Sequence, residues 1–168
     1  MTIRLFYDHW QIYNQAFIDV LGAMTDEQLA IEPGPDRWPV WATAGHTPAA
    51  RVYWLCGVFG EPGADATPWP NPLTDLGWED DLHTPRRADE LVHAWESTWG
   101  IIDGVLERWT PEMLMKPFER EIFGKVQHHT RTSVLQRMFS HEAYHAGELS
   151  QTLGIAGLPQ IDLWKPGT

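Results

Sequence analysis

Hydrophobic residues recur every three or four positions in four long stretches of the chain, which is the spacing that places them on one face of a helix. The clearest stretch runs from Arg131 to about Ile155. At 3.6 residues per turn, it brings one stripe of mostly apolar side chains onto a single face: Val134, Met138, His141, His145 and Thr152. His141 and His145 therefore stand where a helix in a bundle normally buries apolar groups.

The other stretches are separated by strong helix breaks. The pattern predicts a first helix over 3–21, a second over 39–59 and a third over 84–109, with short helices starting near 25 and 110. Residues 60–84 are rich in Pro, Gly and Asp and are long enough to connect two parallel helices. Residues 117–130 are expected to be extended or looped. We therefore expect an all-α protein, a four-helix bundle with a long crossover between helices 2 and 3 and short extra helices.

Composition limits the class of protein. With 168 residues, of which 43% are hydrophobic and 21% charged, the chain is expected to form a single domain over 1–168. A formal net charge of -11 argues against nucleic acid as a partner, because phosphate binding needs a basic surface. Cys56 is the only cysteine, which fits a cytoplasmic location. No signal-peptide pattern and no membrane-spanning apolar run is present, so no membrane partner is expected.

The two histidines of the last helix suggest a metal site. A buried imidazole without a partner costs free energy, and histidines at i and i+4 can offer two nitrogens to one ion. The alternative is a pair of hydrogen-bonded core histidines. His9 falls on the apolar face of the first predicted helix, where it would be a ligand, line the same cleft or bond a neighbour. Glu142 and Glu148 would accept hydrogen bonds from the rings and orient them, or be solvated.

Two other metal sites match the sequence less well. His141 to His145 has the form H-E-x-x-H, in which Glu142 would be the general base of a metalloprotease, but Gln151 occupies the position of the third histidine in the extended motif. A di-iron carboxylate site needs a glutamate from each of two further helices, and the first predicted helix contains none. The metalloprotease therefore remains only as a less favoured alternative.

A third interpretation draws a third ligand, His46, from the second predicted helix. Three neutral imidazoles leave a coordination position open for water or substrate, and they suit zinc, nickel or iron. Pro48 follows closely and removes a backbone donor. The second helix is therefore predicted to kink at Pro48, or to begin its regular part after His46.

The segment His141-Glu142-Ala143-Tyr144-His145-Ala146-Gly147-Glu148-Leu149 resembles the closing helix of the DinB/YfiT-like metalloenzyme superfamily. The same resemblance extends to Trp38-Pro39-Val40-Trp41, to Gly45-His46 and to Arg51-Val52-Tyr53-Trp54. It implies a four-helix bundle that binds one divalent metal ion through His46, His141 and His145, often as a homodimer. It also implies kinship with enzymes that use bacillithiol or mycothiol as S-transferases or as a maleylpyruvate isomerase.

The expected function is therefore that of a metal-dependent enzyme, a thiol S-transferase, isomerase or hydrolase with a small-molecule substrate. The metal would hold a low-molecular-weight thiol as the thiolate, which would attack an electrophile oriented by His9 or Tyr144. Arg51 and Arg137 are the cations expected near the carboxylates of such a thiol. The alternative is a non-catalytic metal-binding stress-response protein whose fourth metal position is closed.

Overall fold

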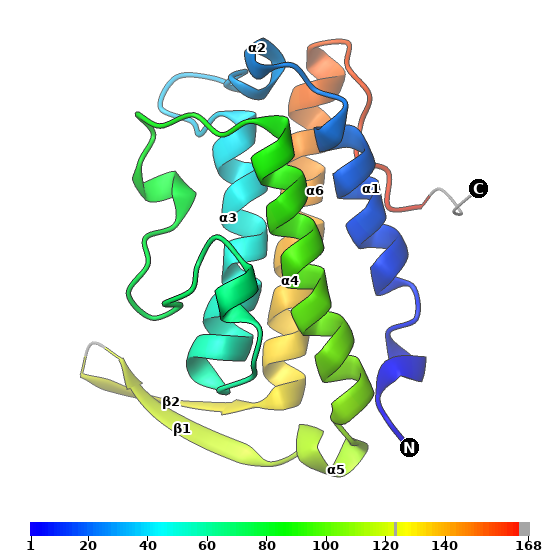
Figure 1. The fold of residues 1–168 in the computed structure, drawn as a ribbon, viewed down its shortest axis with the longest axis vertical. Helices are drawn as coiled ribbons and strands as arrows, with labels where there is room; N and C mark the ends of the chain where they lie inside the picture. The colour runs from blue at the N-terminus through cyan, green and yellow to red at the C-terminus, as the bar shows by residue number, and fades with distance from the viewer. Residues whose placement is uncertain (123, 165–168) are drawn as a thin grey trace.

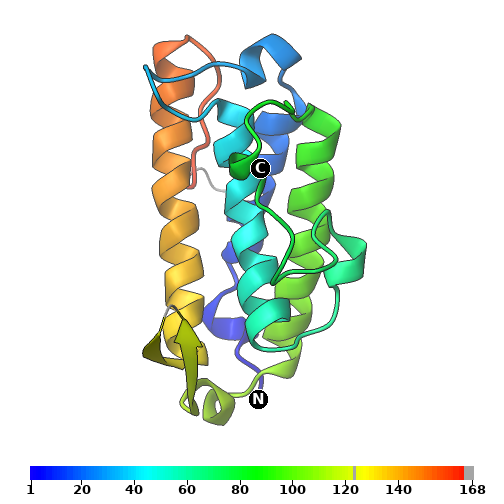
Figure 2. The same ribbon diagram turned by 90° about the vertical axis from the view of Figure 1, so that its left-hand side faces the viewer.

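The computed structural model describes residues 1–122 and 124–164. Four long helices run side by side along its length (Figure 1; Figure 2): α1 (Trp10–Gly22), α3 (Val40–Val52), α4 (Ala88–Arg108) and α6 (Arg131–Ile155). Two short helices, α2 (Asp26–Leu29) and α5 (Pro111–Leu114), lie at opposite ends of the molecule. The strands β1 (Pro117–Ile122) and β2 (Lys125–Thr130) form an antiparallel hairpin, a defined structure for a segment that was predicted only as extended or looped. The protein is thus mostly helical, as predicted.

One hydrophobic core joins the long helices. Helix α4 packs against both α1 and α3, and α3 also packs against α6. Phe17 of α1 stacks on Trp95 of α4, with ring centroids 3.9 Å apart. This packing holds α3 and α6 next to each other, so side chains from both helices can meet.

Helix α6 has the predicted bounds. Thr130 caps it, because the threonine hydroxyl accepts a hydrogen bond from the backbone N–H of Ser133. Val134, Met138 and His145 are buried on the predicted stripe. The periodicity of this segment was therefore sufficient to place the histidine pair correctly.

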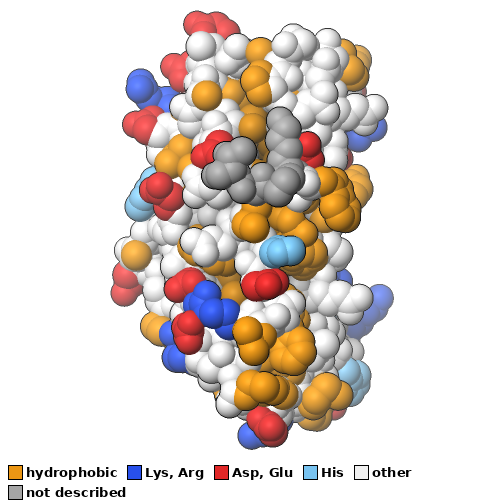
Figure 3. All heavy atoms as spheres, turned by 90° about the vertical axis from the view of Figure 1, so that its right-hand side faces the viewer, with side chains coloured by type: hydrophobic (Ala, Val, Ile, Leu, Met, Phe, Trp, Pro, Cys, Tyr) orange, Lys and Arg blue, Asp and Glu red, His pale blue; other side chains and the backbone are white. Residues whose placement is uncertain are grey.

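The first helix ends close to the predicted residue 21 but starts at Trp10, later than the predicted residue 3. Residues Arg4–Phe6 form a separate 3₁₀ turn, η1, and the side chain of Phe6 is 65% exposed. Figure 3 shows hydrophobic side chains at the surface on the α1 side of the molecule. Helix α1 begins after this turn and buries Trp10, Asn14, Phe17 and Leu21. His9 is the exposed N-cap residue of α1 and does not reach the interior.

Pro48 does not end the second predicted helix. Helix α3 continues through it to Val52, so the expectation that the regular part begins after His46 was wrong. The carbonyl of Ala44, which loses its helical donor at Pro48, accepts a hydrogen bond of 3.0 Å from the indole N–H of Trp95. A tertiary contact thus replaces the missing helical hydrogen bond. The helix then widens into a π-helical segment, η2 (Tyr53–Val58).

The long crossover between η2 and α4 packs against α3. It contains two 3₁₀ turns, η3 (Ala64–Ala66) and η4 (Trp78–Asp80). Trp78 of η4 is buried directly over Gly45, where a Cβ would lie 2.2 Å from the indole ring. Glycine at position 45 therefore allows the crossover to approach α3 one residue before His46. Among the described residues, no helix has the length and hydrophobicity needed to cross a membrane.

Candidate metal centre

Three imidazole rings converge between α3 and α6. The Nε2 atom of His141 lies 3.0 Å from Nε2 of His46 and 3.0 Å from Nε2 of His145. Within residues 1–122 and 124–164, these histidines are the one group of three or more potential metal ligands whose ligand atoms all lie within 4.8 Å of one another. The structure therefore brings together ligand atoms that are 95 positions apart in the chain.

A carboxylate lies behind two of the three rings. Nδ1 of His46 is 2.5 Å from Oε1 of Glu79, and Nδ1 of His145 is 2.7 Å from Oε2 of Glu148. A neutral ring that donates its Nδ1 proton to a carboxylate keeps the lone pair on Nε2. This is the arrangement by which carboxylates orient metal-binding histidines, so the residues present fit a divalent ion such as zinc, nickel or iron.

The protonation states of the histidines and of Glu79 also favour the binding of a metal cation. Burial, followed by repulsion from His145 and His46, lowers the pKa of His141 to about 4. Burial also lowers the pKa of His145, although Glu148 opposes this effect. Burial would raise the pKa of Glu79, but the hydrogen bond and the charge of His46 outweigh it, so the pKa is lowered. At neutral pH the centre thus has an uncharged His141 beside an ionised Glu79, and metal binding requires unprotonated imidazoles.

The sequence analysis missed Glu79. It lies in η4, a short turn of the crossover 33 positions after His46, and no helical or strand period predicts where it points. The only local signal is Gly45, which allows Trp78 to pack against α3 and so brings Glu79 to His46. That signal can be interpreted only when the packing is known.

Glu142 does not orient a histidine ring. It is buried, its Oε1 accepts a hydrogen bond of 2.7 Å from Nε of Arg51, and its Oε2 accepts one of 2.7 Å from the indole N–H of Trp10. Arg51 is fully buried and also donates to Asn14. Both expectations are therefore corrected: Glu142 is neither a partner of the rings nor placed as the base of an H-E-x-x-H site, and Arg51 is not free to bind a carboxylate of a thiol.

The remaining candidates lie around the centre or away from it. Tyr144 is 64% exposed and lines the pocket beside His145. Arg137 places its guanidinium 5.5 Å from the ring of Trp54. Of the other histidines, His128 lies in the hairpin, pairs with Glu119 at 2.9 Å and is outside the three-histidine group.

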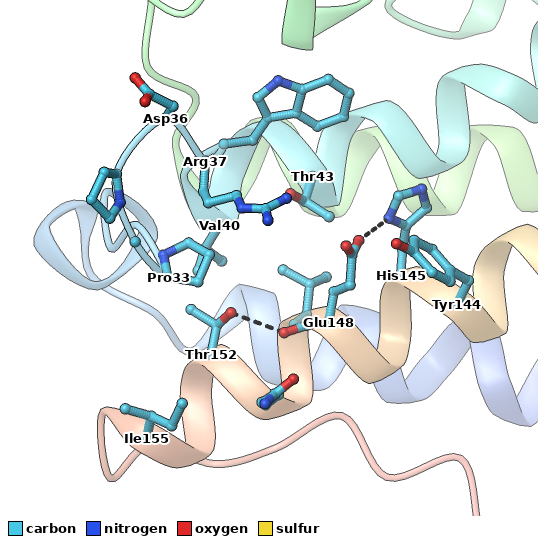
Figure 4. A pocket seen from close by; sticks show the side chains of 15 residues that line it. Pro33, Asp36, Arg37, Val40, Thr43, Tyr144, His145, Glu148, Thr152 and Ile155 are labelled. Atoms are coloured by element: carbon cyan, nitrogen blue, oxygen red, sulfur yellow. Dashed lines mark hydrogen bonds and ion pairs between the residues drawn. The ribbon is translucent and has the colours of Figure 1, made fainter.

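A pocket of about 810 Å³ has His145, but neither His46 nor His141, in its lining. One wall is the loop that precedes α3, and the opposite wall is the C-terminal half of α6 (Figure 4). His145 belongs both to the pocket lining and to the three-histidine group. Glu148, which also lines the pocket, is bonded to Nδ1 of His145, whereas Nε2 of that ring faces His141. The pocket therefore borders the centre through His145 and Glu148.

Comparison with known proteins identifies the family and the fold of the chain. The family model of the DinB superfamily matches residues 9–149, so the chain belongs to this superfamily. The crystal structure of a DinB-like protein from Bacillus cereus superposes with a TM-score of 0.70 and 19% sequence identity, covering 99% of this chain and 97% of that one. At this identity the likeness shows the fold alone. No curated protein matches the chain.

Proposed function

We propose that the chain binds one divalent metal ion, zinc, nickel or iron, through the Nε2 atoms of His46, His141 and His145. The observation that carries this proposal is the convergence of three Nε2 atoms with 3.0 Å between neighbours, with carboxylates behind two of the rings. A hydrogen-bonded pair of core histidines would need neither a third ring from another helix nor Glu79. Three neutral imidazoles around one ion are the ligand set of catalytic zinc sites.

A catalytic role is favoured over that of a non-catalytic stress-response protein. In the described part of the chain, no fourth His, Cys, Asp or Glu joins the three histidines, whereas structural zinc sites are closed by four protein ligands. The pocket that His145 helps to line supplies room for a small molecule near the centre. We therefore infer that the protein is a metal-dependent enzyme with a small-molecule substrate.

The reaction that best suits this centre is attack by a low-molecular-weight thiol on an electrophile, as in an S-transferase or isomerase. When bound, the metal would supply the positive charge that keeps a coordinated thiol deprotonated. Glu79 and Glu148 would hold the rings with their Nε2 lone pairs toward that ion. Cys56 does not compete as the nucleophile, because burial raises the pKa of its thiol to about 11.

Elemental analysis tests the metal site. Wild-type protein and a matched His128→Ala variant are expected to carry one ion per chain, because His128 lies in the hairpin outside the centre. His46→Ala and His145→Ala variants are expected to lose the ion. Full metal content in either of these two variants would overturn the proposal.

Thiol consumption tests the reaction. Metal-loaded protein is mixed with bacillithiol, mycothiol or glutathione and a panel of electrophiles, and the remaining thiol is titrated over time. The expected result is consumption that the His46→Ala variant does not show. If metal-loaded wild-type protein consumes no thiol above that background, the enzyme proposal fails in favour of the non-catalytic alternative.

We further propose that α1, α3, α4 and α6 make up the four-helix bundle of one domain over residues 1–168, and that two chains form a cytoplasmic homodimer. The packing of α4 on α1 and α3 and of α3 on α6 supports the bundle, and the resemblance described above supports the homodimer. Light scattering coupled to gel filtration measures the mass in solution. A monomer mass at micromolar concentration would refute the dimer.

A further inference from the structure

Arg37 differs from the other arginines in the described part of the chain, because no partner holds it. Each of the others forms an ion pair or hydrogen bond or lies over an aromatic ring: Arg4, Arg51, Arg86, Arg87, Arg108, Arg120, Arg131 and Arg137. The chain has 23 acidic residues against 12 basic ones, yet within the described residues none of the ion pairs includes Arg37. Arg37 is exposed, and Lys116 and Lys125 also have no ion pair among the described residues, so the position of Arg37 matters more than its lack of a partner.

The side chain of Arg37 reaches into the pocket beside the metal centre. Figure 4 shows its guanidinium between the two walls, facing the α6 residues Tyr144, His145 and Glu148. It is the one positively charged side chain among the described residues that line the pocket. The carboxylate of Glu148 is already bonded to His145, and that of Asp36 lies at the outer edge. A negatively charged ligand group would therefore find a single cation to bind.

The loop that carries Arg37 is held in shape before any ligand arrives. Three prolines restrict its backbone: Pro33, Pro35 and Pro39. Asp36 has a φ of 57°, and it is the one non-glycine residue with positive φ in the described chain. Aspartate adopts this left-handed conformation more readily than most residues, and here it forms part of the turn that follows Pro35. A hydrogen bond of 3.0 Å from the N–H of Val40 to the carbonyl of Ile31 closes the loop. Pre-organisation of this kind lowers the entropy lost on binding.

The same loop connects the pocket to the metal centre. The ring of Trp38 lies 5.2 Å from the ring of His46, and its side chain is partly exposed at the pocket. Apolar side chains line other parts of the pocket, among them Val40, Leu149 and Ile155. The pocket therefore offers one cation, an aromatic surface and an apolar wall within a single cavity.

We propose that Arg37 binds the carboxylate of an organic anion with an apolar body, and that this pocket selects such anions as substrates. The planar guanidinium can form two parallel hydrogen bonds to one carboxylate. Binding of the anion by Arg37 does not depend on the proposed function. The role of the anion as a substrate does, because the metal centre near the pocket would act on it.

Calorimetric titration of the metal-loaded full-length protein with 2-naphthoate and its neutral isostere 2-naphthamide tests this assignment. The carboxylate is expected to bind at least about tenfold more tightly than the amide to the wild-type protein, the size expected for one charge-assisted contact. The Arg37→Gln variant is expected to lose this preference and keep its metal. Lys125→Gln removes the same charge from the hairpin and is expected to retain the preference.

The His46→Ala variant separates this proposal from the proposed function. If the preference for 2-naphthoate survives in His46→Ala and disappears in Arg37→Gln, the pocket proposal stands whether or not the metal centre is catalytic. A preference that survives in Arg37→Gln but is lost in His46→Ala would show that the carboxylate binds at the metal, and would overturn the assignment. Equal binding of the two probes to wild-type protein, or no binding of either, would also overturn it.

Discussion

Replacing Glu142 by glutamine should remove a large part of the folding free energy of this protein while leaving its metal centre intact. Glu142 is adjacent in sequence to His141, but its side chain is 6% exposed, and its carboxylate accepts hydrogen bonds from Arg51 and Trp10. The Glu142→Gln change keeps the size of the side chain and removes its charge. Arg51, which is fully buried, would then carry an uncompensated positive charge inside the core.

The expected loss follows from the burial of this pair. Removing one partner of a buried ion pair costs about 3–5 kcal/mol, because the remaining charge stays out of water without compensation. Folding free energies are only about 5–15 kcal/mol, so the loss is a large share of the total. For a chain of this size, about 2–4 °C per kcal/mol gives a fall in Tm of roughly 6–20 °C.

Urea denaturation of metal-free protein, followed by circular dichroism, measures the loss without a contribution from metal binding. Glu148→Gln is the matched control, because that carboxylate lies on the same helix and its side chain is 44% exposed. Adding Arg51→Met to Glu142→Gln removes both charges, and the double variant should recover most of the lost stability. Metal content at saturation should equal that of wild-type protein.

Two results would refute this reasoning. A Glu142→Gln variant within about 1 kcal/mol of wild type would mean that the buried pair contributes no more than a surface ion pair. A variant of unchanged stability that loses its metal would instead place Glu142 at the metal, as the H-E-x-x-H interpretation had it.

Three further predictions concern the crossover and Cys56. Glu79→Gln should weaken metal affinity about 10–100-fold, since the carboxylate fixes the ring of His46; competition with a chelator measures this, and a change below twofold would contradict it. Gly45→Ala should destabilise the fold by about 1–3 kcal/mol, because the added Cβ would lie 2.2 Å from Trp78; an unchanged urea midpoint would contradict it. The pKa of the Cys56 thiol is raised to about 11, so less thiolate is present at a given pH. Alkylation of Cys56 by iodoacetamide at pH 8 should therefore be about 100-fold slower in folded than in unfolded protein. Its rate should rise about tenfold per pH unit toward pH 11, and a plateau near pH 8.5 would contradict this.

Local sequence signals were sufficient to predict the bounds of the last helix. A cap at Thr130, an unbroken 3.6-residue period and a terminating glycine-rich stretch act within neighbouring residues, so the bounds Arg131–Ile155 and the common face of His141 and His145 were predictable. The long crossover followed in the same way from its proline and glycine content. The start of the first helix was not predictable from the period alone, because Arg4–Phe6 form a separate 3₁₀ turn although apolar residues continue through them.

The sequence by itself determined which residues could bind a metal ion and on which helices they lie, because ligand type and helical spacing are local properties. Only the tertiary structure decided that Glu79 contacts Nδ1 of His46 and that Glu142 forms an ion pair with Arg51. It also decided that Arg37 is the one positively charged side chain among the described residues that line the pocket. Each of these outcomes depends on which charged groups meet across tens of residues. The packing of α3, α6 and the crossover sets the distances between these charged groups. The hydrophobic period of a single segment cannot predict those distances.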